Sequence, residues 1–270
     1  MQHVRVNSWA ELLDVLYADS WKEGLGRFRS DFAFRGLETP AEEMRTGLMR
    51  LGGDYGELER HLLRNFRKYA YKDAVPVDTV WNWLALAQHY GLPTRLLDWT
   101  FSPFVALHFA TEHVGHFDEE GVVWAVDFIK IKKYLPARLR KPLKEEGANV
   151  FTAELLGRVA GDLEAYDRLA AEQFVAFFEP PSLDQRIINQ FALFSLMSSP
   201  AASLLDWLKA HDGLSKRVVI PAKLKWEVRD KLDQANVSER VLYPGLDGLS
   251  RWLRRQYAPT DRSGKRPDDD

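Results

Sequence analysis

Apolar positions recur along the chain at two spacings, which predict helices and short strands. Apolar residues three or four positions apart indicate an amphipathic helix, whereas alternation or a short apolar run indicates a strand. Helical spacing predicts helices over residues 8–17, 54–71, 78–90, 103–110, 222–235 and 247–257, with a further helix starting at 39–40. Strand patterns occupy residues 31–35, 121–128, 174–178 and 217–220, and residues 186–195 mix both patterns and could be a strand.

Capping and turn residues mark several of these ends. Ser8 and Glu11 form the pattern of a capping box, in which a hydroxyl accepts from a first-turn amide and the acid reaches back. Gly36 is expected to end the strand that precedes it. Gly91 suits the left-handed residue after a helix, and Ser102 suits the cap before the next helix. These signals leave a polar connection between two apolar helices.

The order of the elements predicts the fold class. Helices come first, and scattered strands follow with helices between them, unlike the strict alternation of a doubly wound parallel sheet. We expect one α+β domain over residues 1–257, with a helical N-terminal part and a mixed β-sheet core. No linker rich in glycine, serine or proline divides the chain. Residues 258–270 carry proline, glycine and charge without an apolar anchor, so we expect them to be disordered.

Composition narrows the classes of partner and chemistry. The 37 basic and 39 acidic side chains nearly balance, so the overall charge gives no reason to expect nucleic acid or a membrane as partner. The sequence has no cysteine, which excludes disulfides, a thiolate nucleophile and cysteine-ligated zinc. Residues 1–14 lack the pattern of a secretion signal, and no apolar run approaches the roughly 18–20 residues that span a bilayer. We expect a cytoplasmic protein.

The polar connection between the two apolar helices is the first candidate site. It leads into a helix start, where free amides and the helix dipole favour an anion. The hydroxyls of Thr100 and Ser102 and the cation of Arg95 would complete a pocket for a phosphate or a ribose. His89 and Tyr90 end the preceding helix and would edge the same pocket.

Arg35 is the second candidate, because a charge on an apolar strand is costly unless it is paired. Either Arg35 forms a buried ion pair, with Asp98 as partner, or it faces a cleft and binds an anion. In the second case Gly36 would let the ligand approach the backbone closely. The polar connection has the same two explanations, since Arg95 could pair with Asp98 and Ser102 could serve only as a cap.

Several common motifs for phosphate binding and nucleophilic catalysis are absent from the sequence. It has no Gly-x-x-x-x-Gly-Lys phosphate loop and no Gly-x-Gly-x-x-Gly dinucleotide motif. It also lacks the Gly-x-Ser-x-Gly hydrolase elbow. His108 and His113 are five residues apart, a spacing that does not bring two metal ligands to one helix face, and we expect no metal site.

The candidate residues lie in segments that resemble the FRG domain. Phe-Arg-Gly at 34–36 and QHYGLPTRLLDWT at 88–100 are similar to that family's triplet and central motif, and Ser102, Pro103 and Ala106 continue the match. Weaker similarity follows at residues 121–127, 186–194 and 242–248, so the resemblance extends from Trp9 to Leu253. Ala192 stands where the family usually has glycine. The family is found largely in bacteria and phages.

The same residues are similar to the NAD-binding motifs of ADP-ribosyltransferases. Those enzymes use an Arg or His on an early strand, a Ser/Thr-x-Ser strand end before an apolar helix, and a Glu or Gln near the nicotinamide ribose. Arg35 matches the first position, and Thr100 with Ser102 matches the second. Gln190 is the best match to the third position, with Glu179 and Asp98 as the other candidates.

The resemblance implies an enzyme that cleaves NAD without a metal and transfers ADP-ribose to a macromolecule, or to water as an NAD glycohydrolase. The acceptor would be a protein or a nucleic acid, in a phage defence or toxin context. The cleft would carry Arg35, Gly36, His89, Tyr90, Arg95, Asp98, Thr100, Ser102 and Gln190. Three alternatives stay open: a non-catalytic nucleotide-binding or sensing module, a nuclease built on His89, Asp98 and Arg95, and a structural interaction protein.

Overall fold

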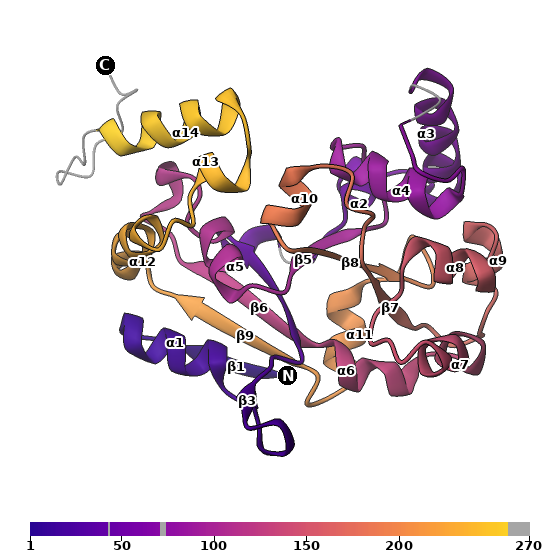
Figure 1. Ribbon diagram of the computed structural model, residues 1–270, viewed down its shortest axis with the longest axis horizontal. Helices are drawn as coiled ribbons and strands as arrows, with labels where there is room; N and C mark the ends of the chain where they lie inside the picture. The colour runs from indigo at the N-terminus through magenta and orange to yellow at the C-terminus, as the bar shows by residue number, and fades with distance from the viewer. Residues whose placement is uncertain (43, 71–73, 259–270) are drawn as a thin grey trace.

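The computed structural model describes residues 1–270 except residues 43, 71–73 and 259–270. A seven-stranded mixed sheet in the order β1-β9-β6-β4-β5-β8-β7 runs through the molecule (Figure 1). Within the described part, β1 pairs with β9 in parallel and the other neighbours pair in antiparallel fashion. The predicted α+β class with a mixed sheet is confirmed. Residues 259–270, the tail that was expected to be disordered, lie outside the described residues.

The strands and helices have the following bounds. The sheet contains β1 Gln2–Arg5, β4 Phe32–Leu37, β5 Leu97–Thr100, β6 Gly121–Asp127, β7 Val175–Phe178, β8 Ala192–Met197 and β9 Ser215–Ile220, and a separate hairpin pairs β2 Trp21–Lys22 with β3 Arg27–Phe28. The helices are α1 Trp9–Tyr17, α2 Gly47–Leu51, α3 Tyr55–Tyr69, α4 Val80–His89, α5 Pro103–Phe109, α6 Phe128–Ile131, α7 Ala137–Glu145, α8 Ala153–Val159, α9 Leu163–Asp167, α10 Gln185–Asn189, α11 Leu204–Ala210, α12 Ala222–Gln234, α13 Glu239–Leu242 and α14 Leu246–Tyr257.

Local capping chemistry explains where several helices begin. Ser8, Asp54, Thr79 and Ser102 each accept a hydrogen bond from a backbone amide of the first turn that follows. Glu11 also reaches back from α1 and accepts from the amide of Asn7. The predicted starts of these helices are therefore correct to within a residue or two.

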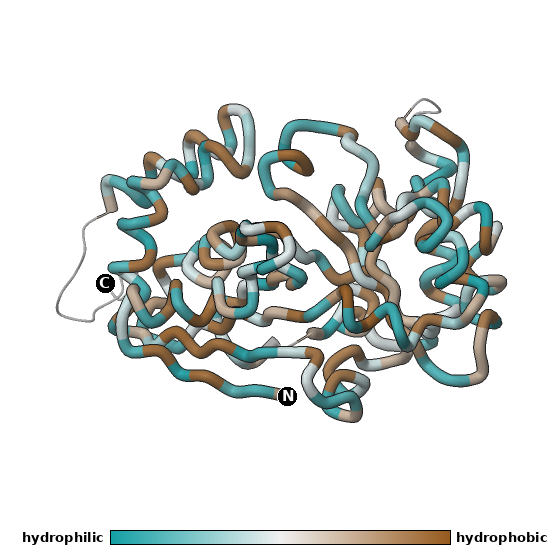
Figure 2. The backbone as a smooth tube through the Cα atoms, turned by 60° about the horizontal axis from the view of Figure 1, so that its bottom comes forward, coloured by the Kyte–Doolittle hydropathy of each residue, from teal (hydrophilic) through white to brown (hydrophobic). Residues whose placement is uncertain are grey.

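Helices cover both faces of the sheet. On one face, α1, α5 and α12 pack against β4, β6 and β9, and α4, α7 and α8 pack against β7 and β8. On the other face, α6 and α11 cover the middle of the sheet. In Figure 2 the tube alternates between hydrophobic and hydrophilic positions along the outer helices, as expected when one side of a helix is buried. The two helical groups on the first face leave room between α5 and α4.

Four sequence predictions differ from the structure. The strand that begins at Phe32 continues through Gly36 to Leu37 because it pairs with β6 along that whole length. The polar connection contains strand β5, whose residues pair with β8 from Leu97 to Thr100. Residues 186–195 are the end of helix α10 and the start of β8 rather than one strand. The expected helix at 39–40 is a short 3₁₀ turn, Pro40–Glu42. Strand β1, the β2–β3 hairpin and the helices α6–α9 and α11 were not expected.

Candidate functional site

A cleft of about 970 Å³ lies between the two helical groups. Its walls come from β4, β5 and β8, the ends of α4 and α5, and parts of α2 and α10. In Figure 1, α10 lies between the α13–α14 pair and the helices α2 and α4. The predicted site residues that line the cleft are Arg35, Gly36, His89, Tyr90, Asp98, Thr100 and Gln190. Arg95 and Ser102 do not line it.

Strands β4 and β5, which both line the cleft, are paired over a very short length. Within the described residues, β4 and β5 share one ladder pair, Phe34 with Thr100. Beyond that pair, Arg35 Nη1 donates to the backbone oxygen of Asp98 at 2.7 Å, so the guanidinium bridges the strands where their ladder has ended. The partner is the carbonyl and not the carboxylate, which corrects the expected Arg35–Asp98 ion pair. Arg35 is partly exposed and lines the cleft.

The Asp98 carboxylate belongs to a polar network that closes the turn after α4. Gln88 Nε2 donates to Asp98 Oδ2 at 2.8 Å, and Thr94 Oγ1 donates to Gln88 Oε1 at 2.5 Å. The amide of Leu96 then donates to Thr94 Oγ1 at 3.0 Å. The network fixes the first residues of β5 relative to the end of α4, and thereby shapes one rim of the cleft.

Arg95 is a structural residue and does not bind a ligand in the cleft. Its guanidinium forms a bidentate pair with Glu59 on α3 and also contacts Asp167 on α9, and both Arg95 and Glu59 are about 4% exposed. Burial alone would lower the pKa of Arg95, but the two carboxylates raise it above the ordinary value. The expected Arg95–Asp98 pair is therefore wrong, and the Arg95 of the nuclease alternative does not meet His89 and Asp98 in the cleft.

The two predicted hydroxyls serve the backbone between β5 and α5. Thr100 Oγ1 accepts from the amide of Ser102 at 3.0 Å, and Ser102 Oγ accepts from the amide of Val105 at 3.3 Å. Ser102 is thus the helix cap, as one of the two explanations of the polar connection requires. Thr100 still lines the cleft, and its hydroxyl can donate a proton because its bond to Ser102 uses only a lone pair.

His89 and Tyr90 lie at the rim where α4 meets α10. His89 Nε2 lies 2.6 Å from Asp184 Oδ2, and the histidine side chain is 8% exposed. Burial acts to raise the pKa of Asp184, but hydrogen bonds from the Ile187 amide and from His89 bring it below the ordinary value. Tyr90 is 70% exposed and stands edge-on to the His89 ring. The His89–Asp184 pair connects two walls, and the exposed Tyr90 ring stands at the opening.

Gln190 is the C-cap residue of α10, two positions before β8, and lines the cleft. Its Nε2 donates to the backbone oxygen of Leu242 at 3.1 Å, and Asn189 Nδ2 donates to that of Val241 at 2.7 Å. These bonds fix the end of α10 to α13. Glu179, the second candidate for the third position, is exposed at the far end of β7 and does not line the cleft.

Comparison with known protein families identifies the segment that contains β4, β5 and α5. Residues 30–119 match the family model of the FRG domain. The chain contains an FRG domain. No curated protein and no solved structure matches the chain. The matched part of the FRG domain covers β4, β5 and α5, whereas the similarity at residues 186–194 and 242–248 lies beyond it and stays a prediction.

The structure gives each residue of the Phe-Arg-Gly triplet a separate role in the FRG domain. Phe34 is buried against α5, and Arg35 faces the cleft. Gly36 brings strand and helix backbones together, because a Cβ at this position would lie 1.8 Å from the carbonyl oxygen of Ala106 and 2.7 Å from the amide nitrogen of Ala110. The close approach inferred from Gly36 is real, but its partner is helix α5 rather than a ligand.

Sequence reasoning missed the residues that line the other wall of the FRG cleft. They are Glu38, Glu112, His113 and His116 beside α5, and Arg186 on α10. No recognised motif marks the first four. Arg186 is the first residue of the segment 186–194, which resembles part of the FRG domain. That resemblance was the one sequence signal that pointed to Arg186.

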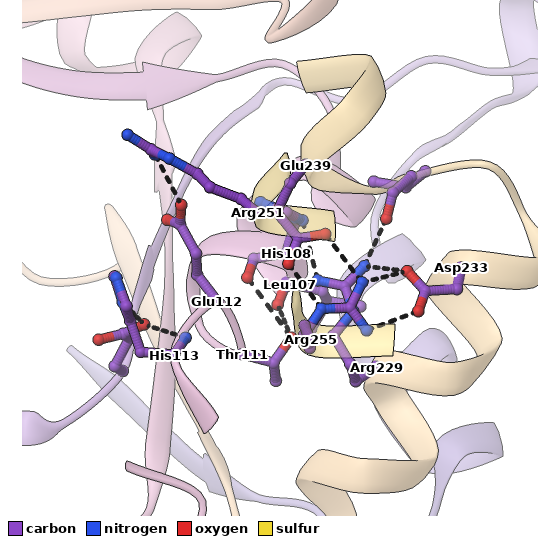
Figure 3. Close-up of polar contacts among 12 residues, drawn as sticks. Leu107, His108, Thr111, Glu112, His113, Arg229, Asp233, Glu239, Arg251 and Arg255 are labelled. Carbon is purple, nitrogen blue, oxygen red and sulfur yellow. Dashed lines mark hydrogen bonds and ion pairs between the residues drawn. The ribbon is translucent and has the colours of Figure 1, made fainter. Parts of the chain in front are cut away.

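A buried polar network connects α5 of the FRG domain to the C-terminal helices (Figure 3). His108 Nδ1 accepts from Arg229 Nη1 at 2.8 Å, which assigns the ring proton to Nε2. Burial and the Arg229 charge lower the pKa of His108 to about 3, so the ring is neutral. Arg255 on α14 pairs with both Asp233 and Glu239. The network secures α13 and α14 beside the cleft.

Two further findings concern metals and membranes. In the described ranges, no group of three or more His, Cys, Asp or Glu side chains is arranged to hold a metal ion. Every helix among the described residues is too short or too polar to cross a lipid bilayer.

Proposed function

We propose that the cleft binds NAD and that the protein transfers ADP-ribose from NAD to a macromolecule. One observation carries the proposal: Arg35 on β4, Thr100 on β5 and Gln190, two residues before β8, all line one cleft, and these three strands are neighbours in the sheet. The cleft volume of about 970 Å³ lies in the range of sites for ligands of this size. The arginines Arg35, Arg50 and Arg186 line the same space and suit a pyrophosphate.

The chemistry assigns each residue a role. Arg35 neutralises phosphate charge and holds the dinucleotide, while the Thr100 hydroxyl and the Gln190 amide bind the hydroxyls of the nicotinamide ribose. The bond between ribose C1′ and the nicotinamide nitrogen breaks, and its electron pair leaves with neutral nicotinamide. Fixed dipoles around the ribose stabilise the positive charge that develops there. NAD belongs to the cell interior, so the proposal includes action in the cytoplasm and extends to a defence or toxin role.

Labelled NAD tests the proposal directly. The purified protein is incubated with NAD carrying label in the adenylate part, together with cell lysate and, separately, with nucleic acid. We expect label on protein or on nucleic acid, accompanied by free nicotinamide. Binding of NAD without either product would instead support a sensing module, and absence of binding would overturn the proposal.

The sensing alternative rests on a specific observation. The hydroxyl of Ser102 is the α5 cap, and the candidate for the third position is an amide, Gln190, rather than a carboxylate. A site whose third position holds an amide in place of a carboxylate suits binding without turnover. The two functions separate in one measurement, because only the transferase releases nicotinamide.

Arg35 gives the first mutational prediction. Arg35→Ala removes the phosphate-binding cation, and loss of a charged hydrogen bond costs about 1.5–3 kcal/mol. We therefore expect NAD to bind about ten- to a hundredfold more weakly by calorimetry. The unfolding temperature should fall by only about 2–4 °C, the cost of losing the bond to the Asp98 carbonyl. The control is Arg138→Ala, an exposed arginine on α7. If Arg35→Ala lowers the unfolding temperature strongly while the remaining folded protein binds NAD normally, Arg35 is a structural residue.

A further inference from the structure

Opposite Gln190, the cleft has a second wall with an unassigned carboxylate. Glu112 lies three residues beyond α5, and its side chain is 13% exposed while it lines the cleft. Its neighbour Glu38, at the end of β4, already accepts from the backbone amide of His113 at 2.6 Å and contacts the ring Nδ1 of the same histidine at 2.5 Å. Glu38 is thus occupied on the protein side, whereas Glu112 faces both protein and cleft.

The charged and titratable groups around Glu112 come from several elements. Tyr243 lies between α13 and α14, and its hydroxyl interacts with the Glu112 carboxylate in a way that favours the ionised acid. Arg251 Nη1 on α14 lies 3.9 Å from Glu112 Oε1 (Figure 3). His113 favours the ionised form of Glu112 and Glu38 opposes it. Burial raises the pKa of Glu112 above its ordinary value, and the Tyr243 hydrogen bond lowers it by a smaller amount.

One short segment positions Glu112 relative to Gln190. Leu242 O accepts from Gln190 Nε2, and the next residue, Tyr243, bonds to Glu112. The Tyr243 ring is held from two sides, with Arg186 Cζ at 5.1 Å and Arg251 Cζ at 4.9 Å from its centroid. The amide and the carboxylate thus interact with adjacent residues, Leu242 and Tyr243, and both line the cleft. The proposed complex has the ribose between them.

Glu112 is not required as the anchor of the C-terminal helices. Arg255 holds α14 through Asp233 and Glu239, and Arg229 connects α12 to His108 on α5. All of these contacts are shorter than the 3.9 Å between Glu112 and Arg251. A partly buried acid that lines the cleft beside an already fixed helix pair calls for another role.

We infer that Glu112 is the general base of the transfer reaction, an inference that rests on the proposed NAD-dependent function. The nucleophilic atom of the acceptor, or of water, forms a bond to ribose C1′ as the C1′–nicotinamide bond breaks. The proton of that nucleophile passes to a Glu112 carboxylate oxygen, and nicotinamide leaves as a neutral molecule with the electron pair of the broken bond. A carboxylate whose pKa lies closer to neutrality than usual is a more effective base than an ordinary glutamate.

The decisive variant is Glu112→Gln, which keeps the size and an acceptor for the Tyr243 hydroxyl. NAD is the probe, with water as acceptor: affinity is measured by calorimetry and turnover by nicotinamide release. We expect affinity within about twofold of the parent protein and turnover about 10²–10⁴-fold lower, the usual contribution of a general base. The matched control, Glu172→Gln, changes an exposed glutamate outside the cleft and leaves both quantities unchanged.

A pH profile separates a base from a structural residue. Tyr243→Phe keeps the ring between the two arginines but removes the hydrogen bond that favours ionised Glu112, so the pKa of Glu112 rises. Turnover needs the ionised form and falls as pH drops through that pKa, so the acid limb of the profile moves to higher pH. The inference is overturned if Glu112→Gln turns over NAD normally, or if Tyr243→Phe leaves the acid limb in place. If the parent protein does not bind NAD, both the inference and the proposed function fail.

Discussion

Replacing Gly36 with alanine is expected to destabilise this fold strongly. The added Cβ would lie 1.8 Å from the carbonyl oxygen of Ala106, a backbone atom that cannot rotate away. Strand β4 and helix α5 would have to separate, which would disrupt the core formed by Phe34 and its neighbours. Overpacking in a core costs about 1–3 kcal/mol and more where backbone must move, so we expect a loss above 3 kcal/mol.

The comparison protein for Gly36→Ala is Gly24→Ala. No heavy atom lies within 4 Å of a Cβ built at Gly24, so this variant should unfold like the parent. Thermal unfolding followed by circular dichroism, with the yield of folded protein, measures both. An unchanged midpoint for Gly36→Ala would mean that the strand–helix contact is looser than the structure shows.

The second large loss of stability is expected when Arg95 is replaced with methionine. This replacement leaves Glu59, which is about 4% exposed, as an unpaired charge between α3 and the core, and breaking a buried pair in this way costs about 3–5 kcal/mol. The loss is measured by denaturant unfolding at neutral pH. Because the cost comes from the stranded carboxylate, the double variant Arg95→Met with Glu59→Leu should recover most of it.

Arg95→Met also tests whether Arg95 belongs to the cleft. Its side chain does not line the cleft, so folded Arg95→Met should bind NAD with the affinity of the parent protein. Arg35→Ala is expected to show the opposite pattern, with weakened NAD binding and largely retained stability. A variant of Arg95 that lost NAD affinity without losing stability would contradict the assignment of the two arginines.

What the sequence predicts well is what depends on nearby residues. Ser8 and Ser102 cap helices because each hydroxyl needs only an amide three residues later. Strand β5 was missed because four residues with an aspartate in second place read as a polar loop, and its pairing partner β8 follows almost a hundred residues later. Residues 185–189 form a helix for a local reason, the Asp184 cap, which the mixed pattern concealed.

The candidate site divides in the same way. The triplet and the central motif identified Arg35, Thr100 and the rim, because these lie in contiguous segments. The partners of Arg95, namely Glu59 and Asp167, are 36 and 72 residues away, so no local pattern could distinguish a buried ion pair from a pocket cation. Gly36 indicated that another group lies very close to its backbone, but the sequence did not identify that group as helix α5. Glu112 belongs to no motif, and only its position beside Tyr243 draws attention to it.

The segment that matches the FRG family model is shorter than the part of the chain that forms the cleft. Residues 30–119 include β4 and β5, which share a single described ladder pair, while their other neighbours β6 and β8 begin only at Gly121 and Ala192. Two strands joined so weakly are not stable alone. Residues 30–119 transferred to another protein would therefore carry the Phe-Arg-Gly triplet and the central motif but would not form the cleft. Arg186 and Gln190, which line the cleft, and Tyr243, which supports it, all lie outside that segment.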